Sequence, residues 1–118
     1  MKTPEAKLIS HCQANVIAAQ TVLDKHIERV RAEPLEAMVW SKSAFQAAAE
    51  LQVSRIILNA LTAEDTKATF ASVHEHAIHE IMQRLSTASS TSSSPTANLA
   101  DLCVLAAWAD IIRSMKRL

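Results

Sequence analysis

Residues 99–112, LADLCVLAAWADII, form the most apolar stretch of the chain and indicate how the rest is arranged. Twelve of the fourteen residues are apolar, and the only charged ones are Asp101 and Asp110. At about 100° per residue, the apolar side chains cover nearly the whole circumference of a helix, which is typical of a helix buried on all sides. We expect it to be a central helix. Its two aspartates then either mark where it emerges into solvent or pair with Lys42.

The composition excludes several classes of fold and site. The 118 residues include no glycine, and glycine supplies the positive-φ positions of tight β-turns and phosphate-binding loops. This argues against hairpin-rich β folds and against glycine-dependent nucleotide motifs such as the P-loop. Strong helix formers dominate outside one serine-rich segment. We expect an all-α protein forming a single domain over residues 1–118.

The charge and cysteine patterns limit the partners and the compartment. Twelve basic and twelve acidic residues cancel, so no overall field attracts phosphate groups, and we expect no nucleic-acid partner. No apolar run has the length of a membrane span, and the first residues lack a signal-peptide core. Cys12 and Cys103 lie within helical apolar patterns, as small buried hydrophobes do. We expect a cytoplasmic protein without a membrane partner.

Two long helices are predicted on either side of Pro34, over residues 4–32 and 34–61. Thr3 and Pro4 are typical of a helix start. Apolar positions then follow the heptad seam of a coiled-coil-like helix. These positions are Ile9, Cys12, Val16, Ala19, Leu23, His26 and Val30. Proline interrupts a helix, and we favour an antiparallel hairpin at Pro34 over a kinked rod, which needs a partner to cover it.

The helix predicted over residues 34–61 carries two apolar arcs and therefore needs two neighbours. The broader arc contains Leu35, Met38, Val39, Phe45, Ala49, Val53, Ile56, Ile57 and Ala60, and is interrupted by Lys42 and Gln46. The opposite arc contains Trp40, Ala44, Ala47, Leu51 and Leu58. If it is left exposed, the opposite arc is an interaction patch.

Two further helices are predicted over residues 63–86 and 96–117, joined by the segment STASSTSSSPT. Thr62 is the expected N-cap of the first of them. The serine-rich segment, residues 86–96, is expected to be a flexible linker. It can span at most about 35 Å, close to the length of about 33 Å of a 22-residue helix. The last helix can therefore run parallel or antiparallel to the third, in its own bundle or in a neighbouring copy. We expect a four-helix bundle, up-down for three helices, with a flexible crossover.

Residues 74–80, HEHAIHE, are the one cluster that could carry chemistry. On a helix His76 lies one turn from both His79 and Glu80, so these three are candidate ligands for a divalent transition metal. His74, with His26 or His11, could complete such a site. However, the helical wheel turns His76 and His79 away from the apolar stripe. We favour a solvated face of His–Glu pairs, and a pH response of the three histidines is a further alternative.

The pattern as a whole favours a non-enzymatic interaction module: a small regulator, adaptor or chaperone acting through apolar helix surfaces. More apolar helix surface is present than one bundle consumes, which predicts a homodimer, another homo-oligomer or a helical partner. No catalytic residue and no cofactor are predicted. The expected partner-binding residues are Trp40, Leu51, Leu58, Trp108, Ile111 and Met115. The alternative is a metal- or small-ligand-binding bundle that uses the cluster at 74–80.

Overall fold

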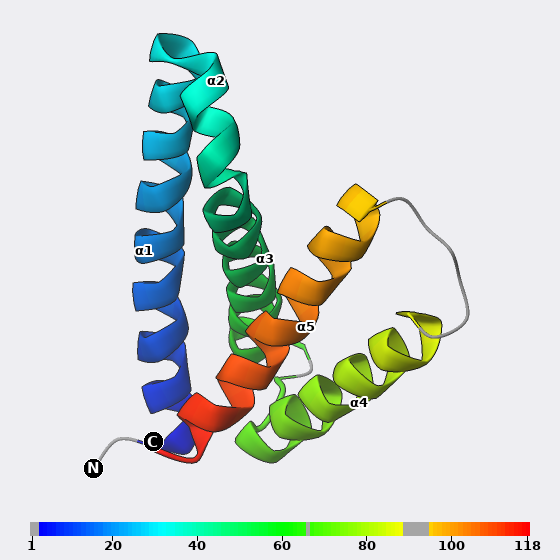
Figure 1. Ribbon diagram of the computed structural model, residues 1–118. Coiled ribbons are helices and arrows are strands. Elements are labelled where there is room, and N and C mark those ends of the chain that lie inside the picture. Colours follow the sequence, from blue (N-terminus) through cyan, green and yellow to red (C-terminus); the bar gives the residue numbers. More distant parts are fainter. Residues whose placement is uncertain (1–2, 66, 89–94) are drawn as a thin grey trace.

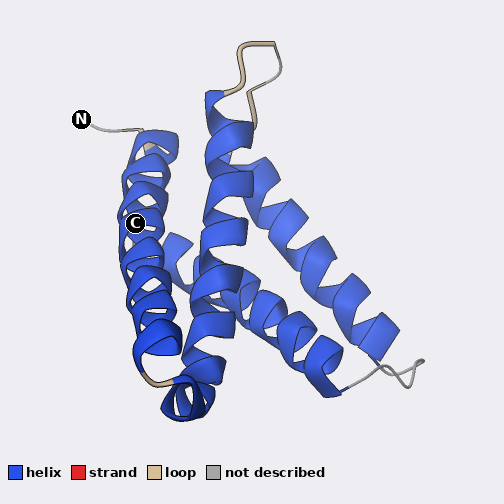
Figure 2. Ribbon diagram, turned by 90° about the horizontal axis from the view of Figure 1, so that it is seen from above, coloured by secondary structure: helices blue, strands red, loops and turns tan. Residues whose placement is uncertain are grey.

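The protein is built from helices packed as two hairpins (Figure 1). The computed structural model describes residues 3–65, 67–88 and 95–118. Its elements are α1 (Pro4–Ala32), α2 (Pro34–Ala37), the 3-10 helix η1 (Met38–Trp40), α3 (Ser41–Thr62), α4 (Phe70–Ala88) and α5 (Pro95–Met115). Within these ranges there is no strand (Figure 2). The expected all-α bundle of long helices is therefore confirmed.

The first hairpin consists of α1 and the nearly continuous run α2–η1–α3. Thr3 caps α1, because its hydroxyl accepts a hydrogen bond from the amide of Ala6 at 3.1 Å. Glu33 alone separates α1 from α2; its backbone leaves the helical region and its amide donates to the carbonyl of Arg29 at 2.7 Å. Pro34 starts the next helix, which returns along α1 (Figure 1). The hairpin interpretation of Pro34 is thus confirmed.

The second hairpin, α4 and α5, crosses the lower half of the first at a slant (Figure 1). The helix α5 runs back along α4 and packs against both α4 and α3. At the base the two ends of the chain meet, where the ammonium of Lys7 lies 3.4 Å from the carbonyl oxygen of Leu118. Nearby, the carboxylate of Glu5 accepts a hydrogen bond from the amide of Phe70 at 3.2 Å. One acidic side chain therefore serves the N-terminal turns of both α1 and α4.

The start of the third long helix differs from the prediction: α4 begins at Phe70, not at residue 63. The hydroxyl of Thr62 donates to the carbonyl of Leu58 at 2.7 Å, so it ends α3 instead of capping α4. Thr69 is the cap. Its hydroxyl accepts from the amide of Ser72 at 3.1 Å, and the hydroxyl of Ser72 accepts from the amide of Thr69 at 2.8 Å. This reciprocal pair satisfies two amides that the first turn leaves unpaired.

One core cluster contains buried residues from α1, α3, α4 and α5 and lies in the lower half of the molecule. Its members are Leu8, Cys12, Ala49, Val53, Ile57, Leu61, Val73, Ala77, Cys103, Val104, Ala107, Trp108, Ile111 and Met115. The predicted heptad seam holds near the start of α1, where Cys12 is buried, but its last position, Val30, is 45 % exposed. The second hairpin does not reach that far up α1 (Figure 1).

The expectation that residues 99–112 are buried on all sides is wrong. Trp108 is buried, whereas Leu102 is 55 % exposed and Ala106 is also exposed. The helix α5 packs against α3 and α4 and lies near α1 at its C-terminal end, whereas the side that carries Leu102 and Ala106 faces solvent. Asp101 and Asp110 are exposed and form ion pairs with Arg84 of α4 and with Arg113, not with Lys42.

The predicted linker over residues 86–96 lies largely outside the described residues. Residues 86–88 continue α4, residues 95 and 96 begin α5, and residues 89–94 are not described. None of the helices in the described part of the chain is long and apolar enough to cross a membrane.

Candidate functional site

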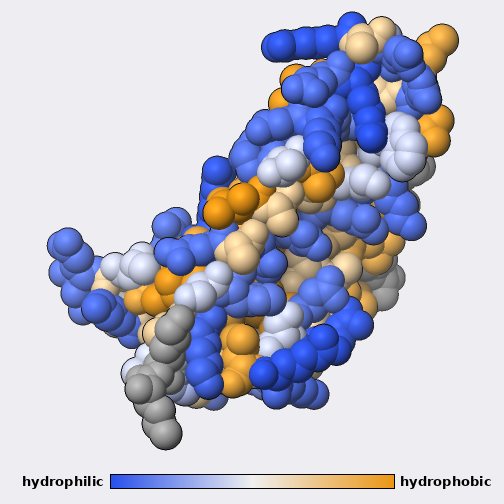
Figure 3. Space-filling view, turned by 90° about the vertical axis from the view of Figure 1, so that its left-hand side faces the viewer, coloured by the Kyte–Doolittle hydropathy of each residue, from blue (hydrophilic) through white to orange (hydrophobic). Residues whose placement is uncertain are grey.

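The upper end of the first hairpin carries a concentration of exposed apolar side chains. We call it the distal apolar surface and define it by six residues: Ile27, Val30, Leu35, Met38, Val39 and Trp40. Leu35, Met38 and Val39 are 84 %, 71 % and 76 % exposed. Apolar surface is visible at this end, interspersed with hydrophilic side chains (Figure 3).

Three residues of the distal apolar surface belong to a predicted arc that is buried lower down. On α3 the broader predicted arc supplies Ala49, Val53 and Ile57 to the core. At the upper end the same predicted arc supplies Leu35 of α2 and Met38 and Val39 of η1, all three of them exposed. The buried Ala37 lies on another side, toward α1. The second hairpin diverges from α3 below this level (Figure 1), so these three side chains lack a neighbour.

Polar groups at the same end hold the hairpin closed. The guanidinium of Arg29 lies 4.7 Å from the centroid of the Trp40 ring, a cation–π contact between α1 and η1. A hydrogen bond with the side chain of Glu36, followed by desolvation, raises the pKa of Glu33. These four residues line a hollow of about 190 Å³. They fix the position of Trp40, which remains 44 % exposed.

The six predicted partner-binding residues are divided between the core and the surface. Trp108, Ile111 and Met115 are at most 4 % exposed and make their contacts within the chain. Leu51 and Leu58 are half-buried, and Trp40 is exposed. Sequence reasoning placed Leu35, Met38 and Val39 in an arc expected to be covered. The interruption of that arc by Lys42 and Gln46 is the signal that distinguishes its exposed end.

The histidines at 74–80 differ in their exposure. His74 is half-buried and His79 is exposed. The side chain of His76 is 51 % exposed, but its ring lies against Trp108 of α5 with the centroids 5.3 Å apart. The prediction that His76 points away from the core is therefore only partly right. Its Nε2 lies 3.8 Å from Oε1 of Glu80.

The predicted metal ligands do not converge with histidines from other helices. Glu80 is shared with Arg84, whose Nε lies 3.6 Å from Oε2, and Arg84 also pairs with Asp101 of α5 at 3.3 Å. His11 contacts Asn15 at 3.3 Å, on α1. Over the described ranges, no three His, Cys, Asp or Glu side chains are grouped so that they could hold a metal ion. His76, His79 and Glu80 thus offer ligands from one helix only.

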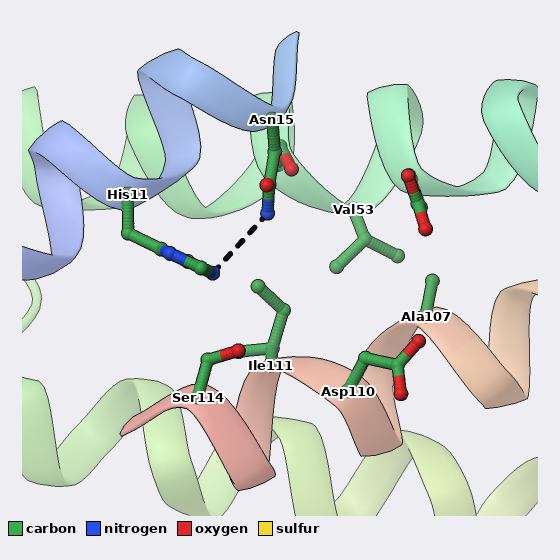
Figure 4. Close-up of a pocket in the computed structure, with 9 residues that line it drawn as sticks. His11, Asn15, Val53, Ala107, Asp110, Ile111 and Ser114 are labelled. Atoms are coloured by element: carbon green, nitrogen blue, oxygen red, sulfur yellow. Dashed lines mark hydrogen bonds between the residues drawn. The ribbon is translucent and has the colours of Figure 1, made fainter. Parts of the chain in front are cut away.

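A small polar pocket lies where α1, α3 and α5 meet (Figure 4). His11 and Asn15 from α1 face Asp110 and Ser114 from α5 across it. Glu50 also lines it, and desolvation, together with the negative charge of Asp110, raises the pKa of Glu50. The volume of about 30 Å³ accommodates one water molecule. The pocket is too small for an organic substrate.

A second hollow, which is apolar, lies between α3 and α4. Its volume of about 350 Å³ is within the range of small-molecule sites. It is lined by Ile56, Ile57, Ala60, Ala68, Ser72, Val73 and His76. The Ser72 hydroxyl is engaged in capping α4, so the His76 ring is the main polar group available to a ligand there.

No known protein family matches this chain, and searches of the curated proteins and of the solved structures find no significant match.

Proposed function

We propose that this chain is a non-enzymatic interaction module, a small regulator, adaptor or chaperone, that binds helices through its distal apolar surface and works as a homo-oligomer. The observation that carries the proposal is the exposure of Leu35, Met38 and Val39, three apolar residues within five positions of α2 and η1. Burial of each such side chain contributes about 1.5–3 kcal/mol. Contiguous exposed apolar groups of this kind mark protein–protein contacts.

The spacing of these residues favours a helical partner. Side chains at i, i+3 and i+4 form a ridge that fits the groove between the ridges of another helix. On α3 the same arc already packs against other helices, since Val53 and Ile57 lie in the core cluster. The same geometry can therefore be extended by a helix from outside the chain.

A binding comparison of three proteins tests this proposal: the wild-type chain, the double variant Leu35→Ser/Val39→Ser, and the control Leu102→Ser. Leu102 is an apolar residue of α5 that is 55 % exposed and lies outside the distal apolar surface. We expect wild type and Leu102→Ser to self-associate or to bind another helical protein. The double variant should lose that binding. Equal association of all three proteins contradicts the proposal.

The small-ligand alternative is supported by one observation, the apolar hollow beside His76. A small apolar molecule bound there would lie next to His76 and alter the environment of the neighbouring Trp108. Titration of Trp40→Phe, in which Trp108 is the remaining tryptophan, with cyclohexanol, which does not absorb or emit in the tryptophan range, tests it by fluorescence. A saturable change that is lost in Ile56→Glu, a variant of a 40 % exposed residue that lines the hollow, supports this alternative. For the metal form, elemental analysis of protein purified without a tag, compared with His76→Ala, is decisive.

A further inference from the structure

We infer that the occupant of the distal apolar surface is a second copy of this chain, which packs hairpin against hairpin about a two-fold axis. The inference rests on the proposed function and names its partner. In such a dimer α1 and α2–η1–α3 of each copy form a central four-helix unit, and the two α4–α5 hairpins lie outside it.

The total accessible surface supports a partner of substantial size. The chain exposes 7896 Å². A compact monomer of 12.9 kDa exposes about 6300 Å² by the usual scaling with mass. The excess is about 1600 Å², and permanent homodimers bury about 1000–2500 Å² per copy. The surplus is therefore of the size that one dimer interface removes.

The shape of the molecule locates that surplus. The radius of gyration is 15.8 Å, whereas a compact chain of 118 residues has about 13.5 Å. The extra extent comes both from the upper half of the first hairpin, which projects beyond α4 and α5, and from the outer end of the α4–α5 hairpin, which slants away from it (Figure 1). There α1 has only α2, η1 and the upper part of α3 as neighbours, and a single helix pair leaves its apolar stripes partly open to water. A second hairpin gives each helix two further neighbours.

The charges around the surface favour a copy of itself over a nucleic acid or a membrane. Between residues 24 and 42 there are four acidic and four basic side chains: Asp24, Glu28, Glu33, Glu36, Lys25, Arg29, Arg31 and Lys42. The segment is neutral, so two copies approach without net repulsion. Helices that bind anionic membranes or phosphate backbones carry an excess of Lys and Arg, which this segment lacks.

The surface also has the properties of a two-fold contact. In a two-fold dimer the same patch meets itself, so it must be self-complementary. Met38, which is flexible and polarisable, adapts to an identical neighbour. Trp40, held by Arg29, supplies a rigid aromatic group, the type of residue that dominates interface energetics.

Light scattering or sedimentation equilibrium over a wide concentration range tests the inference. We expect a mass of twice 12.9 kDa at high concentration for wild type and for Leu102→Glu. The variant Val39→Glu should be monomeric in the same range. Because a two-fold interface contains each residue twice, loss of two apolar side chains raises Kd by about 10²–10⁴-fold. Circular dichroism checks that Val39→Glu keeps its helices, as expected for a residue that is 76 % exposed.

Tryptophan emission gives an independent readout. Trp108 is 1 % exposed in the single chain, whereas Trp40 is 44 % exposed. A blue shift of the emission as the concentration rises therefore reports the burial of Trp40, and Val39→Glu should abolish the shift.

Two results overturn the second-copy inference: a monomer at every concentration, or a dimer that Val39→Glu does not weaken. The proposed function is judged separately. A monomeric chain that binds another helical protein, and loses this binding in Leu35→Ser/Val39→Ser, contradicts the inference and the homo-oligomer part of the proposed function, but supports helix binding through the distal apolar surface. A monomer whose binding to other proteins is unchanged by Leu35→Ser/Val39→Ser contradicts both the inference and the proposed function.

Discussion

The imidazole of His76 meets the indole of Trp108 edge to face, with the ring centroids 5.3 Å apart and the ring planes at 77°. The contact joins α4 to α5 at the largest fully buried side chain of the protein. Within the described part of the chain the indole N–H of Trp108 has no hydrogen-bond partner. The specific contact of the Trp108 indole is therefore the edge-to-face contact with His76. It places the His76 ring at the border of the core.

Substitution of His76 by alanine is expected to lower the free energy of unfolding by about 0.5–1.5 kcal/mol, since this is the usual contribution of an aromatic pair. Urea unfolding measures the loss. His79→Ala is the matched control, because His79 is exposed on the same helix and an exposed substitution changes stability by less than about 0.5 kcal/mol. Equal losses in both variants contradict a stabilising ring contact.

Replacement of Thr69 by alanine is expected to cost about 0.5–2 kcal/mol, because it removes the side-chain acceptor that caps α4. The control is Thr62→Ala. The hydroxyl of Thr62 only bonds back to the carbonyl of Leu58 in its own helix, and such bonds contribute little. Thermal unfolding of the two variants should separate them. If Thr62→Ala is the more damaging, Thr62 has the capping role after all.

Stability should fall as the pH rises from about 9 to about 11, and Cys12 is the cause. Burial raises the pKa of the Cys12 thiol from 9.0 to about 11. In this window the unfolded chain loses the proton and the folded chain keeps it, so proton loss favours unfolding. The stabilising effect is complete below pH 9 and is lost as the pH passes the folded pKa. The chain contains no tyrosine, which simplifies the alkaline titration.

Comparison of Cys12→Ala with Cys103→Ala isolates this effect. Unfolding midpoints measured across the window should decline less steeply for Cys12→Ala than for wild type. Cys103→Ala retains Cys12 and should keep the wild-type slope. If the unfolding midpoint of Cys12→Ala declines with pH as steeply as that of wild type, groups other than Cys12 cause the decline.

Replacement of Glu50 by glutamine is expected to stabilise the protein at neutral pH. Desolvation, and to a lesser degree Asp110, raises the pKa of Glu50 above its ordinary value of 4.5. Because the folded pKa is raised, protonated Glu50 stabilises the folded state fully below pH 4.5. This stabilisation is lost as the pH rises through the folded pKa, so near pH 7 the ionised carboxylate destabilises the folded state. The gain in Glu50→Gln should be on the order of 0.5 kcal/mol, because the group is partly screened by solvent.

Denaturant unfolding at several pH values checks this prediction. The advantage of Glu50→Gln over wild type should shrink as the pH falls from neutral through the raised pKa, and should be gone below 4.5. Glu64→Gln replaces an exposed carboxylate and should give no comparable gain. A destabilised Glu50→Gln at neutral pH means that the carboxylate has a structural partner.

Several features of the fold follow from local sequence alone. Pro34 cannot continue α1, and Thr3 with Pro4 begins it, so the bounds of the first hairpin are determined by residues a few positions apart. The start of α4 was predicted seven residues too early, because Thr62 and Thr69 both suit an N-cap. Only their hydrogen-bond partners distinguish the two residues. The hydroxyl of Thr62 bonds to Leu58 in α3, whereas that of Thr69 bonds to Ser72 in α4.

The candidate site depended on tertiary structure to a greater degree. Trp108 and Leu35 are both large apolar residues on long helices, yet one is 1 % and the other 84 % exposed. Helix periodicity assigns each to an apolar arc but contains no information about how far a neighbour extends along that arc. A 29-residue α1 is about 43 Å long and a 21-residue α5 about 31 Å, and α5 also slants away from α3 (Figure 1).

The sequence by itself determined that the chain is all-α, where it turns at Pro34, and which residues share an arc, because these depend on backbone preferences and spacing within a segment. Only the tertiary structure decided that the stretch 99–112 is buried on one side and that the distal apolar surface is uncovered. Burial depends on the number, length and slant of the neighbouring helices. These are properties of all the packed helices together. An apolar arc can be buried by a helix of its own chain or by a helix of a second chain.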